Sequence, residues 1–322
     1  MSSRRPRYKR AAHSPPMRFQ DRDGAIIQAI YDNDGALARR HLKAMFWSGA
    51  TKQAMEQRLS LLYHNGYLNW PNLEQRRTKP IPEPVIWLGW RGALSIAGQH
   101  DVQVQPPKSD NENQLRTLEN HLRDQGIRWH REPRWIQLAH DLAVVDFKLA
   151  VERSVFQLPS FKIDQWLSES VFRSNTDVVC FQAQGKDGKV RTAKKGVCPD
   201  AYFEIVDESR KASGEPHRAR FLLELDRATH DNPSFGREKV LPGVAYIKSS
   251  EYKTRFGYNS GRWLVVTLGQ RRMENLMLQT QEKAKQDAPL FFFTTLDHLA
   301  TENVFTSPIW LQPNSNKPIS LI

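Results

Sequence analysis

Hydrophobic residues recur at helical spacing through the first third of the chain. Two short apolar stretches, residues 25–31 and 37–47, each predict a helix, and the polar segment 32–35 predicts the turn between them. Thr51 is suited to cap a third helix, whose apolar stripe consists of Met55, Leu59, Leu62 and Tyr63. Gly66 follows at a place where helices commonly end. The pattern predicts a small helical domain.

Two strand-like runs, residues 67–70 and 85–88, follow these helices. The loop between them carries three cations, Arg76, Arg77 and Lys79. Three helices and a two-stranded ribbon with a basic tip are typical of a winged helix-turn-helix, which we predict over residues 21–98. The polar face of the third helix, which would enter the major groove, carries Lys52, Gln53, Gln57 and Arg58. Gln and Arg suit base edges and Lys52 suits a phosphate, whereas the alternative is a helical domain that contacts protein.

Positive charge is concentrated in the same part of the chain. The net charge is +12; residues 1–98 hold 16 Lys and Arg against 7 Asp and Glu, which gives +9, and the remaining 31 against 28 give +3. Such an asymmetry indicates a polyanionic partner, and we predict double-stranded DNA. Residues 1–20 contain six cations, no acid and three prolines, which predicts a disordered basic arm that attracts phosphates. The alternative is a tail that only aids solubility.

The pattern changes after residue 135. Residues 99–135 contain a Pro-rich stretch and one polar helix, so we interpret them as a connector. Residues 136–322 predict a second domain of mixed α/β type, in which residues 183–196 form a loop or hairpin tip. Its expected helices and strands are, in order, helix 142–156, strand 161–169, strand 201–206, strand 218–226, a two-part helix 235–247 broken at Pro242, strand 263–268, helix 274–287 and strand 290–295.

Carboxylates stand at the ends of two of these predicted strands. Glu224 and Asp226 are two residues apart on one strand and therefore share a face. Asp200 follows Pro199 at the start of the neighbouring strand. Like charges this close disfavour joint ionisation unless a cation lies between them. We therefore predict that Asp200, Glu224 and Asp226 form a site for a hard cation such as Mg²⁺.

The order of these elements resembles the PD-(D/E)xK nuclease superfamily, whose fold is that of restriction endonucleases. Pro199-Asp200 and Glu224 match the metal-binding acids of that superfamily, but Asp226 occupies the position of its lysine. The resemblance implies catalytic roles for the matching acids, with Lys239 of the following helix in place of the missing lysine and Glu169 as a supporting carboxylate.

The chain as a whole, over about residues 20–312, resembles the replication-relaxation family of plasmids and other mobile elements. The resemblance rests on the segments 67–68 and 85–92, His140-Asp141-Leu142, Trp166-Leu167-Ser168-Glu169, Pro199-Asp200 and 224–229, followed by Lys239 and Tyr246. Ala228 departs from the more usual glycine. This resemblance implies a DNA-binding protein that acts in plasmid replication and DNA relaxation, with replication or mobilisation proteins as partners.

Two hypotheses remain open for the second domain. It is either an inactive scaffold, which Asp226 in place of lysine favours, or a Mg²⁺-dependent DNA endonuclease, which the three carboxylates favour. Other classes lack their motifs: the chain has no phosphate-binding or dinucleotide-binding glycine loop, and Cys180 and Cys198 provide neither a zinc ligand set nor a disulfide framework. No apolar run is long enough to span a membrane, and we expect a cytoplasmic protein.

Overall fold

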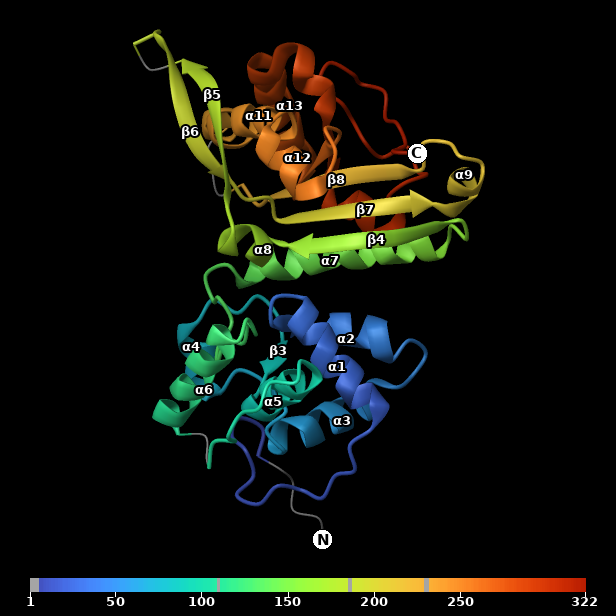
Figure 1. The fold of residues 1–322 in the computed structure, drawn as a ribbon. Helices are drawn as coiled ribbons and strands as arrows, with labels where there is room; N and C mark the ends of the chain where they lie inside the picture. The colour runs from blue at the N-terminus through green and yellow to red at the C-terminus, as the bar shows by residue number, and fades with distance from the viewer. Residues whose placement is uncertain (1–5, 109–110, 185–186, 229–231) are drawn as a thin grey trace. The chain divides into compact units, whose positions relative to one another are not determined.

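A computed structural model describes residues 6–108, 111–184, 187–228 and 232–322, and shows a mixed α/β protein (Figure 1). The chain divides into two compact units, Met1–Val145 and Asp146–Ile322, and the division falls inside helix α7 (Leu138–Phe156). It therefore lies about ten residues beyond the predicted boundary at residue 135. The segment that we interpreted as a connector belongs to the first unit.

The first unit combines helices with a small antiparallel sheet. Its strands pair in the order β1-β3-β2, with Ala36 opposite Trp87 and Leu68 opposite Leu88. Buried isoleucines and leucines of three helices, such as Ile26, Leu42 and Leu59, form its core. Its elements are α1 (Asp21–Asp32), β1 (Ala36–Ala38), α2 (Arg39–Phe46), α3 (Lys52–His64), β2 (Leu68–Asn69), α4 (Leu73–Thr78), β3 (Val85–Leu88), α5 (Trp90–Gln99) and α6 (Glu112–Asp124).

Two predicted elements of this unit differ in the structure. Residues 37 and 38, which we expected at the start of the second helix, form strand β1 together with Ala36, because residues 36–38 pair with residues 85–87 of β3 and are buried. The predicted basic loop contains the short helix α4, which Asn72 caps by accepting a hydrogen bond from Gln75 N at 2.8 Å. The three helices and the two strands that the pattern predicted are otherwise present.

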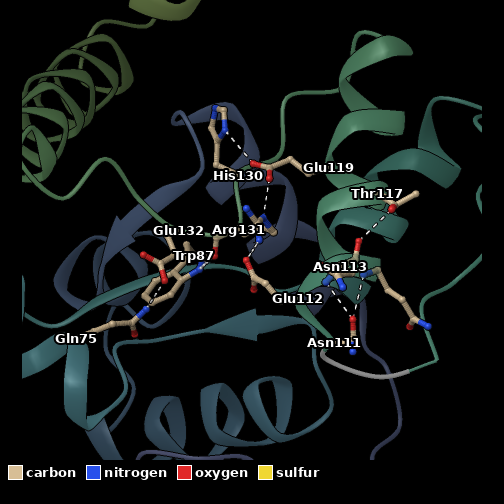
Figure 2. A network of polar contacts seen from close by, with 11 residues as sticks. Gln75, Trp87, Asn111, Glu112, Asn113, Thr117, Glu119, His130, Arg131 and Glu132 are labelled. Carbon is tan, nitrogen blue, oxygen red and sulfur yellow. Dashed lines mark hydrogen bonds and ion pairs between the residues drawn. The ribbon is translucent and has the colours of Figure 1, made fainter.

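Polar contacts attach the former connector to this unit (Figure 2). Arg131 forms ion pairs with Glu112 and Glu119 of helix α6, and its backbone oxygen accepts a hydrogen bond from Trp87 Nε1 at 2.8 Å. Trp129 Nε1 donates to Leu88 O at 3.1 Å. Because these bonds reach the central strand β3, residues 112–131 are part of the packed unit and not a linker.

The second unit is built on a five-stranded sheet of order β10-β9-β8-β7-β4. Strand β7 runs antiparallel to both β4 and β8, whereas β9 runs parallel to β8 and β10 runs parallel to β9. Its strands are β4 (Phe161–Ser168), β5 (Asp177–Gln184), β6 (Val190–Val197), β7 (Ala201–Asp207), β8 (Arg218–Asp226), β9 (Arg262–Thr267) and β10 (Phe291–Thr295). Its remaining helices are α8 (Glu169–Ser174), α9 (Glu208–Ala212), α10 (Asn232–Phe235), α11 (Leu241–Ile247), α12 (Ser250–Phe256), α13 (Gln270–Ala284) and α14 (Leu296–Thr301).

Helices cover both faces of this sheet. Tyr202 and Leu222 belong to one hydrophobic cluster with residues of α11, α12 and α13, and these helices lie on one side of the sheet in Figure 1. Phe203 points to the opposite face, where its ring lies 5.9 Å from that of Phe147 in α7. Strands buried on both sides explain the continuous apolar runs that predicted them.

Two further predictions concern irregular segments. The predicted two-part helix is present, because the π-helical turn Gly236–Val240 precedes α11, in which Pro242 occupies the first turn. The segment 183–196 was predicted as a loop or hairpin tip, and its residues 185 and 186 lie outside the described residues. Residues 190–197 form strand β6, which pairs with β5 in an antiparallel hairpin. Its polar sequence gave no alternating pattern from which to predict a strand.

Candidate functional site

The outer face of helix α3 is polar and exposed. Thr51 caps the helix by accepting a hydrogen bond from Ala54 N at 3.3 Å. The buried stripe of Met55 and Leu59 turns the opposite face, with Lys52, Gln53 and Gln57, to solvent. The predicted recognition face therefore keeps these three side chains.

Arg58, the fourth predicted member of that face, is used inside the unit. Its Nε donates to Asp23 Oδ1 at 2.7 Å, its Nη2 reaches Asp23 Oδ2, and Nη2 also donates to Arg18 O at 2.8 Å. Asp23 is fully buried. The hydrogen bond to Asp23 raises the pKa of Arg58. The structure thus corrects the prediction of a base contact: Arg58 neutralises a buried carboxylate that lies 35 residues earlier in the chain.

The three predicted cations of the ribbon are exposed. Arg76 and Arg77 lie in the last turn of α4, and Lys79 follows it. Arg76 also lies over the ring of Tyr8, at 5.7 Å from its centroid. The predicted basic tip is therefore present, on a helix and not on an open loop.

The N-terminal arm, predicted to be disordered, is docked along the end of α3 over its described part, residues 6–20. Arg10 Nη1 donates to Tyr63 O at 2.9 Å and its Nη2 to Asn69 Oδ1 at 2.6 Å. Ala11 N donates to His64 Nδ1 at 3.0 Å. Further hydrogen bonds join Ser14 to His64 O, Asn65 to Pro15 O and Trp70 to Arg7 O. These partners on α3 and β2 supply contacts that the arm's composition does not reveal.

In the second unit, the strand register places Asp200 directly opposite Glu224. Ala201 of β7 pairs with Leu223 of β8. Asp200, which precedes Ala201, therefore lies opposite Glu224, which follows Leu223. Asp200 N donates to Leu223 O at 2.9 Å, and Leu225 N donates to Asp200 Oδ2 at 2.6 Å. Both carboxylates are buried. The two carboxylates therefore lie on neighbouring strands, as predicted.

Lys239 reaches this pair from the π-helical turn. Its Nζ lies 2.7 Å from each oxygen of Glu224. Burial alone lowers the pKa of Lys239, but the charges of Glu224 and Asp200 outweigh burial and raise the pKa above its ordinary value. Lys195 of β6, which we had not predicted as a site residue, is close enough to Lys239 to feel its charge. Burial, followed by the positive charge of Lys239, lowers the pKa of Lys195.

Asp226 is directed to a different partner. Arg272 of α13 donates to both of its oxygens, at 2.8 and 2.9 Å, and Ala228 N donates to Oδ1 at 2.8 Å. In residues 6–108, 111–184, 187–228 and 232–322, no three His, Cys, Asp or Glu side chains are spaced to hold a metal ion. The predicted site of three carboxylates is therefore not assembled, because a guanidinium 46 residues away engages the third.

Glu169, the predicted supporting carboxylate, begins α8 one residue beyond the end of β4. Ser168 pairs with Ala201, so the register brings the start of α8 beside Asp200. The Glu169 carboxylate accepts from Arg173 at 2.6 Å, and its backbone oxygen accepts from the Cys198 thiol at 3.8 Å. Burial, with Glu169 as the next cause, raises the pKa of this half-buried thiol to about 11, which favours the protonated form at neutral pH.

The arrangement fits a divalent cation in part. Asp200 and Glu224 provide the hard oxygen atoms that Mg²⁺ prefers, and Lys239 provides the positive charge that the strand itself lacks. Asp226 does not add a third carboxylate while Arg272 holds it. Asp200 and Glu224 are accordingly the residues that would bind the ion.

A protein-family model described as "Replication-relaxation" matches residues 32–255, which is more than half of the chain and includes α3, Asp200, Glu224 and Lys239. Neither curated proteins nor solved structures gave a match. Within the described residues, no helix is long and apolar enough to cross a membrane.

Proposed function

The chain belongs to the replication-relaxation family, and from this premise we propose that it binds duplex DNA in the replication of a plasmid or other mobile element. In this proposal the first unit is a winged helix-turn-helix that contacts the DNA. The second unit is a nuclease-like domain that this module brings to the DNA. Replication or mobilisation proteins are the protein partners that the family suggests.

The element order of the first unit is the observation that carries the proposal. The order α1-β1-α2-α3-β2-α4-β3, with β3 between β1 and β2 in the sheet, supports a winged helix-turn-helix in which α4 lies within the ribbon. Strand β1, which sequence reasoning missed, completes the three-stranded sheet of that fold. The sheet and helices α1 and α2 fix α3 with its polar face outward.

Charge supports the same proposal. Lys52 at the start of α3 and Arg76, Arg77 and Lys79 at the ribbon are all exposed. Cations on such a surface release counterions from DNA, so affinity falls as the salt concentration rises. Exposed Gln53 and Gln57 add side chains that can hydrogen-bond base edges.

Duplex binding by the full chain, followed by fluorescence anisotropy across salt concentrations, tests the proposal. We expect Lys52→Gln and Arg77→Gln each to reduce the slope of log affinity against log salt by about 1, the effect of losing one phosphate contact. Arg116→Gln on α6 removes the same charge from an exposed site outside this face and is the matched control. Equal effects of all three variants would mean that the contact is not at α3 and the ribbon.

A second candidate function, Mg²⁺-dependent cleavage of DNA, is favoured by the contact between Lys239 and Glu224. Among the elements of the five-stranded sheet and its main helices, the sequence α7, β4, β7, β8, α11 and β9 supports a nuclease-like fold, although the hairpin β5-β6 and short helices lie between them. Asp200 and Glu224 lie at adjacent strand positions. When bound, the metal ion would activate water and stabilise charge on the phosphate. Asp200 and Glu224 would hold that ion, and the Lys239 ammonium would offset their negative charge in a buried site.

Incubation of the full chain with supercoiled plasmid and Mg²⁺ or Mn²⁺ separates this candidate from an inactive scaffold. Cleavage that Asp200→Asn abolishes supports the enzyme. Asp207→Asn, at the other end of the same strand, is the matched control and should leave cleavage unchanged. Plasmid that stays intact with both metals, in a preparation that binds DNA, indicates that the second unit is a scaffold.

A further inference from the structure

The first unit contains a basic cleft beside helix α3, and we infer that it binds a phosphate group of the DNA backbone, with the N-terminal arm as one of its walls. The inference rests on the proposed function and specifies a second contact region within it. Helices α2 and α3, Trp70 and the segment Glu83–Pro84 form the remaining walls.

Charge and size define the ligand that suits the cleft. Its volume is about 700 Å³. Two acids, Glu56 and Glu83, line it against five cations, which leaves an excess of 5 − 2 = +3; the cations are Arg7, Arg39, Arg40, Lys43 and Lys52. An anionic group gains from this excess, and the phosphate of the DNA backbone is the anion that the proposed function supplies.

Arg39 is a cation of the cleft that the protein satisfies only in part. Its Nη1 donates to Glu56, and its guanidinium lies over the Trp70 ring at 5.2 Å from the centroid. Its Nε is buried and has no hydrogen-bond partner among the described residues. A phosphate oxygen that enters the cleft therefore adds an acceptor beside an incompletely satisfied guanidinium.

The aromatic side chains of the cleft favour a phosphate over a nucleobase. Trp70 already stacks on Tyr63, with ring centroids 3.8 Å apart and planes 13° apart, and Arg39 lies over it as well. The ring is thus engaged by the protein and is not open for a base to stack on. Lys52 lines the cleft and also belongs to the exposed face of α3, so the cleft is continuous with the proposed DNA surface.

The arm closes one side of the cleft. Pro6 and Arg7 line it, and Trp70 Nε1 donates a hydrogen bond to Arg7 O at 2.9 Å. The bonds of Arg10 and Ala11 to the end of α3 hold the neighbouring part of the arm. Loss of the arm would therefore open the cleft and remove Arg7, so the arm acts as a positioned part of the site and not as a free tail.

Two substitutions test the cleft in the full chain with a fluorescent DNA duplex as the probe. Lys43→Gln removes an exposed cation of the cleft wall without touching the core. We expect the slope of log affinity against log salt concentration to fall by about 1, the effect of one lost phosphate contact. At about 0.9 per contact, a fourfold rise in salt concentration should weaken DNA binding by the variant about 3.5-fold less than it weakens binding by the wild type. Trp70→Phe removes the donor to Arg7 O but keeps an aromatic ring, and should lower affinity about threefold by releasing the arm.

Arg116→Gln is again the control, and circular dichroism checks that each variant is folded. The inference is overturned if Lys43→Gln and Trp70→Phe bind like the control while Arg77→Gln, which lies outside the cleft, binds weakly; the proposed function then stands without the cleft. Absence of duplex binding by the wild-type chain overturns both. Weaker binding of the two cleft variants, with no change of preferred sequence in Lys43→Gln, supports the phosphate site.

Discussion

Removing the Arg58 guanidinium should destabilise the first unit and leave the DNA sequence preference unchanged. Arg58→Ala leaves the Asp23 carboxylate, whose side chain is 0% exposed, without its cation. Loss of one partner of a buried ion pair costs about 3–5 kcal/mol. For a unit of this size, 1 kcal/mol shifts the melting temperature by about 2–4 °C, so we expect Tm to fall by roughly 6–20 °C.

Thermal unfolding of the full chain measures the shift, and hydrogen exchange of the α1 and α3 amides assigns it to the first unit. Gln57→Ala, an exposed neighbour on α3, should change stability by no more than about 0.5 kcal/mol. The double variant Asp23→Ala with Arg58→Ala should cost less than the sum of the single variants, because no charge remains buried alone. Our reasoning is refuted if Arg58→Ala is as stable as Gln57→Ala but binds altered DNA sequences.

Two further stability predictions follow from close contacts. Asp226→Asn should lower the free energy of unfolding by about 1–3 kcal/mol, because Arg272 loses its charged acceptor; denaturant titration measures this, and an unchanged midpoint would mean that the pair contributes nothing. Gly89→Ala should lower the free energy of unfolding by about 1–3 kcal/mol, because the added Cβ would lie 2.2 Å from Gly66 O. The control Gly98→Ala adds a Cβ that meets no atom within 4 Å, so it should be neutral or stabilising. Equal effects of the two variants in the same titration would contradict the close approach of the backbone at Gly89 and Gly66.

Much of the fold could be predicted because burial leaves a periodic pattern. The stripe of α3 and the apolar runs of β7 to β10 placed these elements close to their observed bounds. Residues 37 and 38 were assigned to a helix because the short apolar run before Arg39 carries no period of its own. Their strand exists through pairing with β3, which lies almost 50 residues later and leaves no local signal.

In the candidate sites, too, features with a local sequence signal could be predicted, and features that depend on a distant partner could not. The positions of Asp200, Glu224 and Lys239 followed from strand ends and from the resemblance, and the structure brings these three together. Asp226 and Arg58 were misassigned because each has a partner of opposite charge far along the chain, Arg272 and Asp23 respectively. Charge content alone does not reveal whether a polar residue faces solvent or a buried counter-ion.

The central claim is that the exposed face of α3 contacts duplex DNA. Photo-crosslinking measures this most directly: a benzophenone amino acid replaces Gln57 on α3, or Arg116 on α6, in the full chain bound to a labelled duplex. Both positions are exposed, so both variants should fold. We predict a DNA crosslink from position 57 and none from position 116. A crosslink of equal yield at both positions, or at position 116 alone, would contradict the claim.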